Sequence, residues 1–184
     1  MLALLGALAA CATLSAREET LVPFQDRQVR VTVPDTYLFA AGRTESGILT
    51  VKINDPLHRI DLVVSFFPDA TGRMATDDGQ RGFVADASRQ FAEGSVEMSY
   101  DFQELKPRAG AGLYCVFTDA TLVRKLPLPP GEYLKVTSGV KAWPGCFILF
   151  TLLSNDTTSG EYQAALKLIQ ESFEEKERPA KPPA

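Results

Sequence analysis

The feature that most constrains this chain is a series of short apolar runs with a period of two, bounded by proline, aspartate and glycine. Residues 28–33 and 48–54 alternate between apolar and polar side chains, and Pro34-Asp35 and Asp55-Pro56 come directly after them. Because successive side chains of a strand point to opposite faces of a sheet, these runs predict half-buried strands bounded by turns. Residues 60–67 are nearly apolar throughout, which predicts a central strand covered on both sides.

The second half of the chain continues this pattern. Strand-type runs occupy residues 95–105, 113–123, 133–143 and 146–153. Residues 126–131 predict a loop, because consecutive prolines cannot pair inside a sheet, and Pro144-Gly145 is a turn dipeptide. We therefore expect the last three runs to form an antiparallel up-down-up meander. A further short strand or loop is expected near residues 37–41, and the polar residues 17–28 are expected to lead into the fold.

Two segments change to helical spacing. Between residues 77 and 93 the apolar side chains lie three or four positions apart, Asp77 or Asp78 can cap the start, and Gly94 closes the segment. The clearer helix follows Thr158 and Ser159, either of which supplies the N-cap. Its apolar stripe consists of Tyr162, Ala165, Leu166, Ile169 and Phe173.

Length and composition are those of one globular domain. The chain has 184 residues, of which 45% are hydrophobic and 23% charged, and eleven Phe are available for a single core. We expect one domain of strands and helices over about residues 19–176. A disordered tail is expected at 177–184, where Pro179 and Pro182-Pro183 occur.

The first sixteen residues carry no charge and consist almost entirely of Leu, Ala and other small residues. This run is too short to cross a bilayer, which takes about 20 residues, and it is typical of a secretory signal. Cleavage after Ala12 or Ala16 would release a soluble exported domain. Leu8-Ala9-Ala10-Cys11 also matches a bacterial lipobox, although no Lys or Arg precedes it. In that alternative Cys11 is lipidated, and the protein is anchored to a membrane without crossing it.

Two further cysteines, Cys115 and Cys146, invite a disulfide in an oxidising compartment. The predicted meander places residue 115 opposite 142, and residue 142 opposite about 147. The two thiols would then lie at the same end of the sheet with one strand between them, about 10 Å apart. A disulfide needs Cα atoms within about 7 Å, so we expect two separate buried thiols.

Several common kinds of functional site are excluded. The net charge is −4 and no basic run exceeds two residues, which argues against nucleic-acid binding. His58 is the one histidine, and its place in a turn is typical of a solvated loop residue rather than a catalytic base. One His and two isolated Cys supply no zinc-ligand spacing. Gly110-Ala111-Gly112 precedes a strand, whereas a phosphate loop precedes a helix. We therefore expect no metal, no cofactor and no enzymatic activity.

One group of side chains is a candidate recognition surface. Tyr133, Lys135, Lys141 and Trp143 share one parity of a single predicted strand, so they face the same side of the sheet. If that face were open, these aromatic and basic side chains could form a patch for a partner. The alternative is that they pack under a helix, with lysine stems at the rim.

Two short stretches accompany this order of elements. They are Val33-Pro34-Asp35-x-Tyr37 and the final helix, Tyr162-Gln163-Ala164-Ala165-Leu166-Lys167-Leu168-Ile169-Gln170-Glu171-Ser172-Phe173. Over residues 22–176 the chain thereby resembles the Mog1/PsbP-like family, including bacterial envelope lipoproteins of the DcrB type. The resemblance implies an α+β fold with a twisted, mainly antiparallel sheet of about six or seven strands packed between helices. It implies binding to other proteins and carries over no catalytic residue.

These observations lead to one expected function and one alternative. The export signal, the missing catalytic constellations and the resemblance predict a non-catalytic envelope protein that binds a protein partner or stabilises an assembly. The alternative is a protein that binds a small hydrophobic or lipid-like ligand, in a cleft between sheet and helix lined by Phe and Tyr. An enzyme that uses an acid or a Cys is a third, weaker hypothesis.

Overall fold

The computed structural model describes residues 15–25, 27–57, 59–125 and 127–175. Its strands are β1 (Ala16–Phe24), β2 (Arg27–Pro34), β3 (Leu38–Arg43), β4 (Leu49–Asn54), β5 (Ile60–Pro68), β6 (Gln103–Leu105), β7 (Ala111–Thr118), β8 (Lys135–Trp143), β9 (Cys146–Ser154) and β10 (Phe173–Glu175). The helices are η1 (Arg73–Ala75), α1 (Asp77–Ala87), α2 (Arg89–Glu93) and α3 (Gly160–Ser172). The predicted targeting segment with Cys11, His58 and the predicted tail at 177–184 lie outside the described residues.

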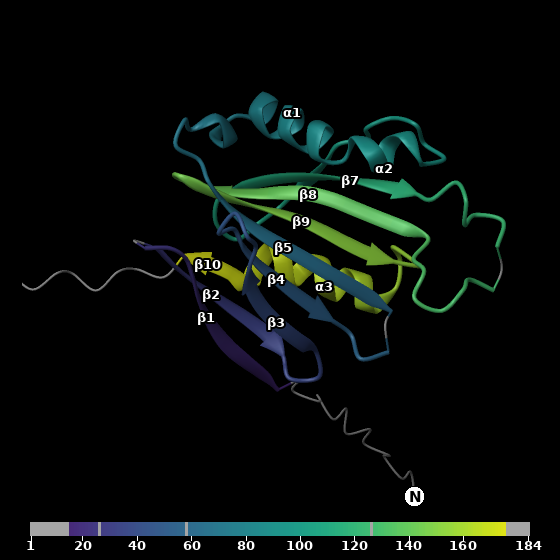
Figure 1. The fold of residues 1–184 in the computed structure, drawn as a ribbon, viewed down its shortest axis with the longest axis horizontal. Helices are drawn as coiled ribbons and strands as arrows, with labels where there is room; N and C mark the ends of the chain where they lie inside the picture. Colours follow the sequence, from purple (N-terminus) through teal and green to yellow (C-terminus); the bar gives the residue numbers. More distant parts are fainter. Residues whose placement is uncertain (1–14, 26, 58, 126, 176–184) are drawn as a thin grey trace, which may run out of the picture.

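The strands form two antiparallel sheets. Seven strands pair in the order β3-β4-β5-β9-β8-β7-β6, and β1, β2 and β10 form a smaller sheet in the order β1-β2-β10. Helix α3 lies behind the large sheet, near the small sheet, while α1 and α2 lie on the opposite side along β7 and β8 (Figure 1). The fold is therefore α+β, with a mainly antiparallel sheet between helices, as the sequence predicts.

The face of the large sheet toward α3 holds the main core. On β5 every second residue is buried on this face: Ile60, Leu62, Val64 and Phe66. They belong to one apolar cluster with Ala165 and Ile169 of α3 and with Val31 and Val33 of β2. The period of two along β5 thus explains why one face is sealed by a helix and a second sheet.

A smaller core lies under α1. It contains Met74, Val84, Leu113, Cys115, Phe117, Val140, Ala142 and Phe147. The ring of Phe83 packs edge-on against Phe147, with the ring centres 4.9 Å apart. The N-cap of helix α1 is Thr76, whose hydroxyl accepts a hydrogen bond from the Gly79 amide, so the predicted caps Asp77 and Asp78 are one and two positions too late.

The predicted helix over 77–93 is two helices. Ser88 interrupts it, because its φ of −107° and ψ of 12° are not helical and its hydroxyl donates to the carbonyl of Val84. The terminal helix matches the prediction, since the Ser159 hydroxyl accepts from the Tyr162 amide at its start.

Three strand predictions are wrong. Residues 17–28 were expected to lead into the fold, but β1 pairs with β2 from Ala16 onward. Of the predicted strand over 95–105, only the last three residues form β6; the Glu97 carboxylate instead binds the amide and hydroxyl of Thr118, and Met98 has a φ of 49°. Finally, β5 is covered on its second side only near its end, where Phe67 packs against Phe83 of α1, while Asp61, Val63 and Ser65 are only half-buried.

The meander of β7, β8 and β9 is confirmed, but part of its register differs from the prediction. Residue 142 pairs with 147 as expected, whereas Cys115 pairs with Ser138 rather than with residue 142. Residues 119–125 form a turn of their own, which moves the start of β8 relative to β7. Cys115 lies in the core under α1 and Cys146 in the core on the α3 face. The two thiols therefore lie on opposite faces of the sheet, in different cores.

Candidate functional site

The predicted recognition surface does not form an open patch. Lys141 is 1% exposed and Trp143 is 7% exposed, and both side chains lie on the α3 face of β8. Tyr133 precedes β8, and Lys135 donates from Nζ to the hydroxyl of Thr118, 2.6 Å away. The alternative prediction, that these side chains pack under a helix, agrees better with the structure. It differs in that Lys141 is fully buried rather than at the rim.

Lys141 instead closes the C-terminal end of α3. Its Nζ donates to the carbonyls of Ile169, Gln170 and Phe173 at 3.1, 3.0 and 2.9 Å. An ammonium group has three donors, so all of them are used, and the last carbonyls of the helix gain a cationic partner. Burial lowers the pKa of Lys141 to about 8, partly opposed by the charge of Glu174. This residue is a structural clamp between the sheet and α3.

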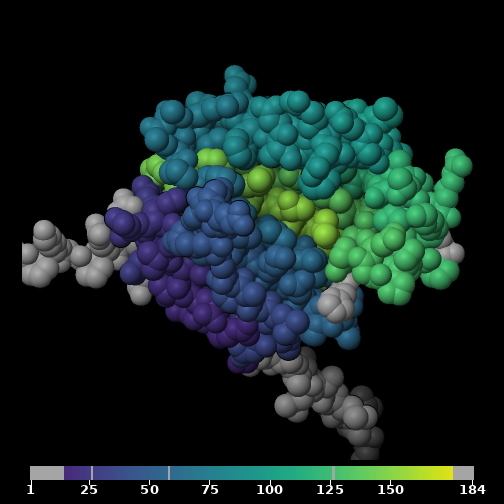
Figure 2. All heavy atoms as spheres, viewed as in Figure 1, coloured from purple at the N-terminus to yellow at the C-terminus, as the bar shows by residue number. Residues whose placement is uncertain are grey.

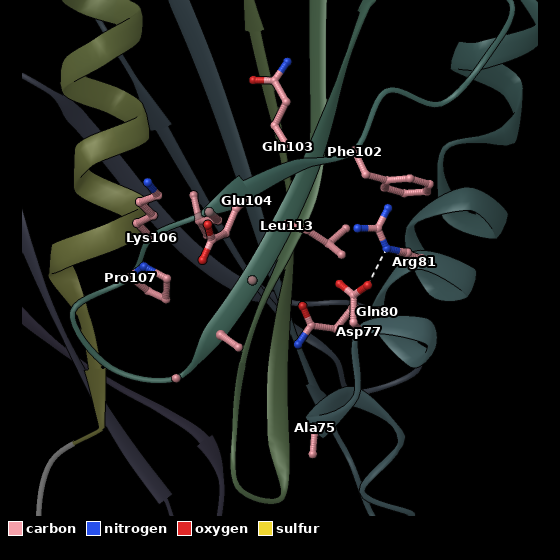
Figure 3. A pocket seen from close by; sticks show the side chains of 14 residues that line it. Ala75, Asp77, Gln80, Arg81, Phe102, Gln103, Glu104, Lys106, Pro107 and Leu113 are labelled. Carbon is pink, nitrogen blue, oxygen red and sulfur yellow. Dashed lines mark hydrogen bonds and ion pairs between the residues drawn. The ribbon is translucent and has the colours of Figure 1, made fainter.

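A cleft lies between α1 and the β6–β7 hairpin. It has a volume of about 560 Å³. Arg81 and Asp77 of α1 form an ion pair on one side, with the ring of Phe102 next to the guanidinium, while Glu104 and Lys106 lie across the cleft (Figure 3). Two acids and two bases thus line this space. It suits polar groups of a partner better than an apolar ligand, which needs mainly apolar walls.

A second candidate surface is the part of the large sheet that α1 and α2 leave uncovered. Here called the open face, it consists of three rows across β3, β4, β5 and β9: Gly42, Thr50, Ser65 and Leu149; Ala40, Lys52, Val63 and Thr151; and Leu38, Asn54, Asp61 and Leu153. Figure 2 shows β9 at the surface between the helices and the strands of the N-terminal half. All twelve side-chain positions are half-buried or exposed.

The open face is a flat surface with few long side chains. Most of its residues are small, and one end is a shallow hollow of about 360 Å³ lined by residues of β3 and β4, including Ala40, Gly42 and Thr50. Lys52 and Asp61 are its two charged residues. The sequence did not identify this surface, because the period of two tells which residues share a face but not whether a helix covers that face.

Cys115 is unsuited to nucleophilic catalysis. Burial raises the pKa of its thiol to about 12, helped by the charge of Asp101, so the thiolate is scarce at neutral pH. Cys146 is buried as well, and the guanidinium of Arg27 lies 3.4 Å from its sulfur.

Asp55 is the most deeply buried carboxylic acid among the described residues. Its environment shows whether it could serve as an acid or a base. Its carboxylate accepts from Nε of Arg59 at 2.6 Å, and Arg59 also pairs with Glu161 at the start of α3. The Arg59 guanidinium holds the pKa of Asp55 below its usual value. This ion-pair chain fixes the β4–β5 connection to α3 and keeps Asp55 ionised, which suits a structural role.

Two further features are absent from the part of the chain that the structure describes. Within it, no group of three His, Cys, Asp or Glu side chains is arranged to hold a metal ion. No helix in those same ranges is long and apolar enough to cross a membrane.

Comparison with known proteins bears on the fold. The chain is similar to the solution structure of cyanobacterial PsbP (CyanoP) from Synechocystis sp. PCC 6803, with a TM-score of 0.54 over 92% of this chain and 98% of that chain, and with 12% sequence identity. The chain matches no protein-family model and no curated protein sequence. The seven-stranded antiparallel sheet between helices is therefore a Mog1/PsbP-like fold. At this identity the likeness is one of fold alone.

Proposed function

We propose that this protein is a non-catalytic, exported accessory module that binds a protein partner through the open face. The observation that carries the proposal is the partial cover of the large sheet. A sheet face that stays in water normally alternates to polar side chains, whereas the open face holds Val63 of β5 and Leu153 of β9. Leu149 lies at its margin, where it packs against the core under α1. Leu38 on the edge strand β3 is also exposed. Half-buried apolar side chains on a broad flat surface favour a macromolecular partner.

The proposed localisation is the bacterial envelope. The uncharged segment at residues 1–16 supports export, and the lipobox-like Cys11 supports a lipoprotein of the DcrB type. Intact mass and N-terminal sequence of the mature protein test this. A diacylglycerol adduct on Cys11 supports the anchored form, cleavage after Ala12 or Ala16 supports the soluble form, and an unprocessed Met1 contradicts export.

Site-specific photocrosslinking tests the open face directly. A photoreactive amino acid at Lys52, which is exposed on β4, should give a discrete crosslinked product in envelope extract. The matched control places the same amino acid at Lys167, which is exposed on α3, on the opposite side of the sheet. The substitution Ala40→Arg should abolish the product at position 52 without changing the melting temperature. Equal products at both positions, or none at 52, would contradict the proposal.

The small-ligand alternative is less well supported. The cleft beside α1 has the volume of a ligand site, but a hydrophobic ligand would have to displace water from Asp77, Arg81, Glu104 and Lys106. A thermal-shift screen with fatty acids and phospholipids should leave the melting temperature unchanged. A saturable increase that is removed by Ala111→Trp, at an exposed residue lining the cleft, would favour the alternative.

A further inference from the structure

Two loops at one end of the molecule carry exposed apolar side chains. Val96 and Met98 follow α2 and are 55% and 78% exposed, and Val123 follows β7 and is 42% exposed. We call these three residues the apolar tip. Backbone hydrogen bonds tie the two loops together, from the Val96 amide to the Thr118 carbonyl at 2.9 Å and from the Ala120 amide to the Gly94 carbonyl at 3.1 Å. In Figure 1 the end of α2 and the loop after β7 lie at the same end of the sheet.

The tip is held in a strained conformation. Met98 has a φ of 49° and is the one non-glycine residue of the described ranges with a positive φ. The Met98 amide donates to the hydroxyl of Ser95 at 3.1 Å, and that hydroxyl donates to the Ala92 carbonyl at 2.9 Å. A left-handed conformation costs a non-glycine residue on the order of 1–2 kcal/mol. This conformation does not bury the Met98 side chain. We therefore infer that it holds the side chain outward for contact with another molecule.

The acidic and basic side chains of the two loops differ in their hydrogen bonding. The Glu97 carboxylate accepts from the amide and hydroxyl of Thr118 at 2.8 and 2.5 Å, and the Asp119 carboxylate accepts from the amide and hydroxyl of Thr121, both at 2.7 Å. Both acids are therefore already hydrogen-bonded within the loops.

The basic side chains of the same loops are not bound within the loops in this way. Arg124 and Lys125 come directly after Val123 and are exposed. Their charged groups take part in none of the hydrogen bonds or ion pairs of the described residues, although the charge of Lys125 helps to lower the pKa of Asp119. Among the acids at this end, Glu93 is the exposed one without such a bond. The apolar tip is thus flanked by two cations whose ammonium and guanidinium groups are free to donate hydrogen bonds.

We propose that the apolar tip docks on a lipid bilayer that contains anionic lipid. Val96, Met98 and Val123 enter the region between headgroups and acyl chains, and Arg124 and Lys125 meet the headgroup phosphates. Exposed aliphatic side chains beside cations are the combination that holds peripheral proteins at such a surface. The apolar residues of the tip are Val and Met, whereas hot spots of protein–protein contacts are enriched in Trp, Tyr and Arg and poor in Val, so a protein pocket is the less favoured occupant. This inference does not depend on the open face.

Vesicle co-sedimentation tests the proposal. The full chain carries Cys11→Ser, so that no attached lipid contributes. We expect it to bind vesicles of phosphatidylcholine mixed with phosphatidylglycerol, and to bind vesicles of phosphatidylcholine alone more weakly. Met98→Asp should weaken binding to the mixed vesicles about tenfold, since a carboxylate is costly to bring to an anionic surface.

Two further variants make the outcome decisive. Val22→Asp, at an exposed valine of β1, should bind like the parent protein. The double variant Arg124→Ala, Lys125→Ala should lose the preference for phosphatidylglycerol but keep the weaker binding to phosphatidylcholine. Because all four positions are exposed, a melting temperature near that of the parent is expected for each variant. Absence of binding to mixed vesicles, or equal loss in Met98→Asp and Val22→Asp, would overturn the proposal. A crosslink from position 98 to a protein, without vesicle binding, would overturn it in favour of a protein pocket.

Discussion

The two faces of the seven-stranded sheet are built from the same strands but differ in what they bury. On β5, Val64 is fully buried on the α3 face, while its neighbour Val63 is only half-buried on the open face. The sealed face also holds a lysine whose three donors are all used at the end of α3. The open face instead combines small residues with partly exposed Leu side chains. The difference indicates that the α3 face supplies most of the buried apolar surface, whereas the open face leaves apolar side chains partly in contact with water.

The largest expected effect contrasts two adjacent leucines of β9. Leu152 is buried on the α3 face, and Leu153 is half-buried on the open face. Leu152→Ala should lower the free energy of unfolding by about 2–5 kcal/mol, because it leaves a cavity in a packed core. Leu153→Ala should cost about 1 kcal/mol or less, since much of the side chain already contacts water. Urea unfolding measures both, and equal losses would show that the two faces do not differ in this way.

The second effect depends on pH and tests the lysine on the sealed face. Burial lowers the pKa of Lys141 to about 8 in the folded protein, against about 10.4 in an unfolded chain. Between these values the unfolded state binds more protons, so the free energy of unfolding rises with pH. Below pH 8 both states are protonated and this contribution is constant. The rise should reach about 3 kcal/mol at most by pH 10.4.

Lys141→Met is the matched control for this pH dependence. It lacks the titrating group, so the difference in unfolding free energy between the parent and Lys141→Met should grow in favour of the parent from pH 8 to 10. The variant also leaves the carbonyls of Ile169, Gln170 and Phe173 without their donor. Amide hydrogen exchange in the last turn of α3 should therefore be faster at pH 7 than in the parent. A pH-independent difference would contradict the lowered pKa.

The same two faces show how far the sequence could predict this structure. Periodicity identified most strands, the meander and the terminal helix with its Ser159 cap, because these depend on neighbouring residues along the chain. It could not tell that the side of β8 with Lys141 is sealed while the far side of β5 is open, since cover depends on where a distant helix packs. Parity alone therefore left the Tyr133 to Trp143 group with two interpretations.

The wrong boundaries have a related cause. Residues 95–102 alternate like a strand, yet the Glu97 carboxylate binds Thr118, which is 21 positions away along the chain. Such long-range hydrogen bonds between side chain and backbone compete with a sheet ladder and leave no local signal. The apolar tip was missed for this reason, because an alternating run predicts that Val96 and Met98 pack against a sheet.

The smallest expected effect concerns the strain at that tip, on the same side of the sheet as the open face. Met98→Gly removes a side chain that buries little surface and places the one residue type that adopts a positive φ at low cost. Relief of strain and the greater freedom of glycine in the unfolded chain oppose each other, so the free energy of unfolding should rise by only about 0.5 kcal/mol. Val96→Gly is the control, because Val96 has no positive φ and the same change should lower it by a similar amount. Urea unfolding of both variants measures this pair. A loss of stability in Met98→Gly as large as in Val96→Gly would show that Met98 is not strained, and the argument that its side chain is held outward would then lose its physical basis.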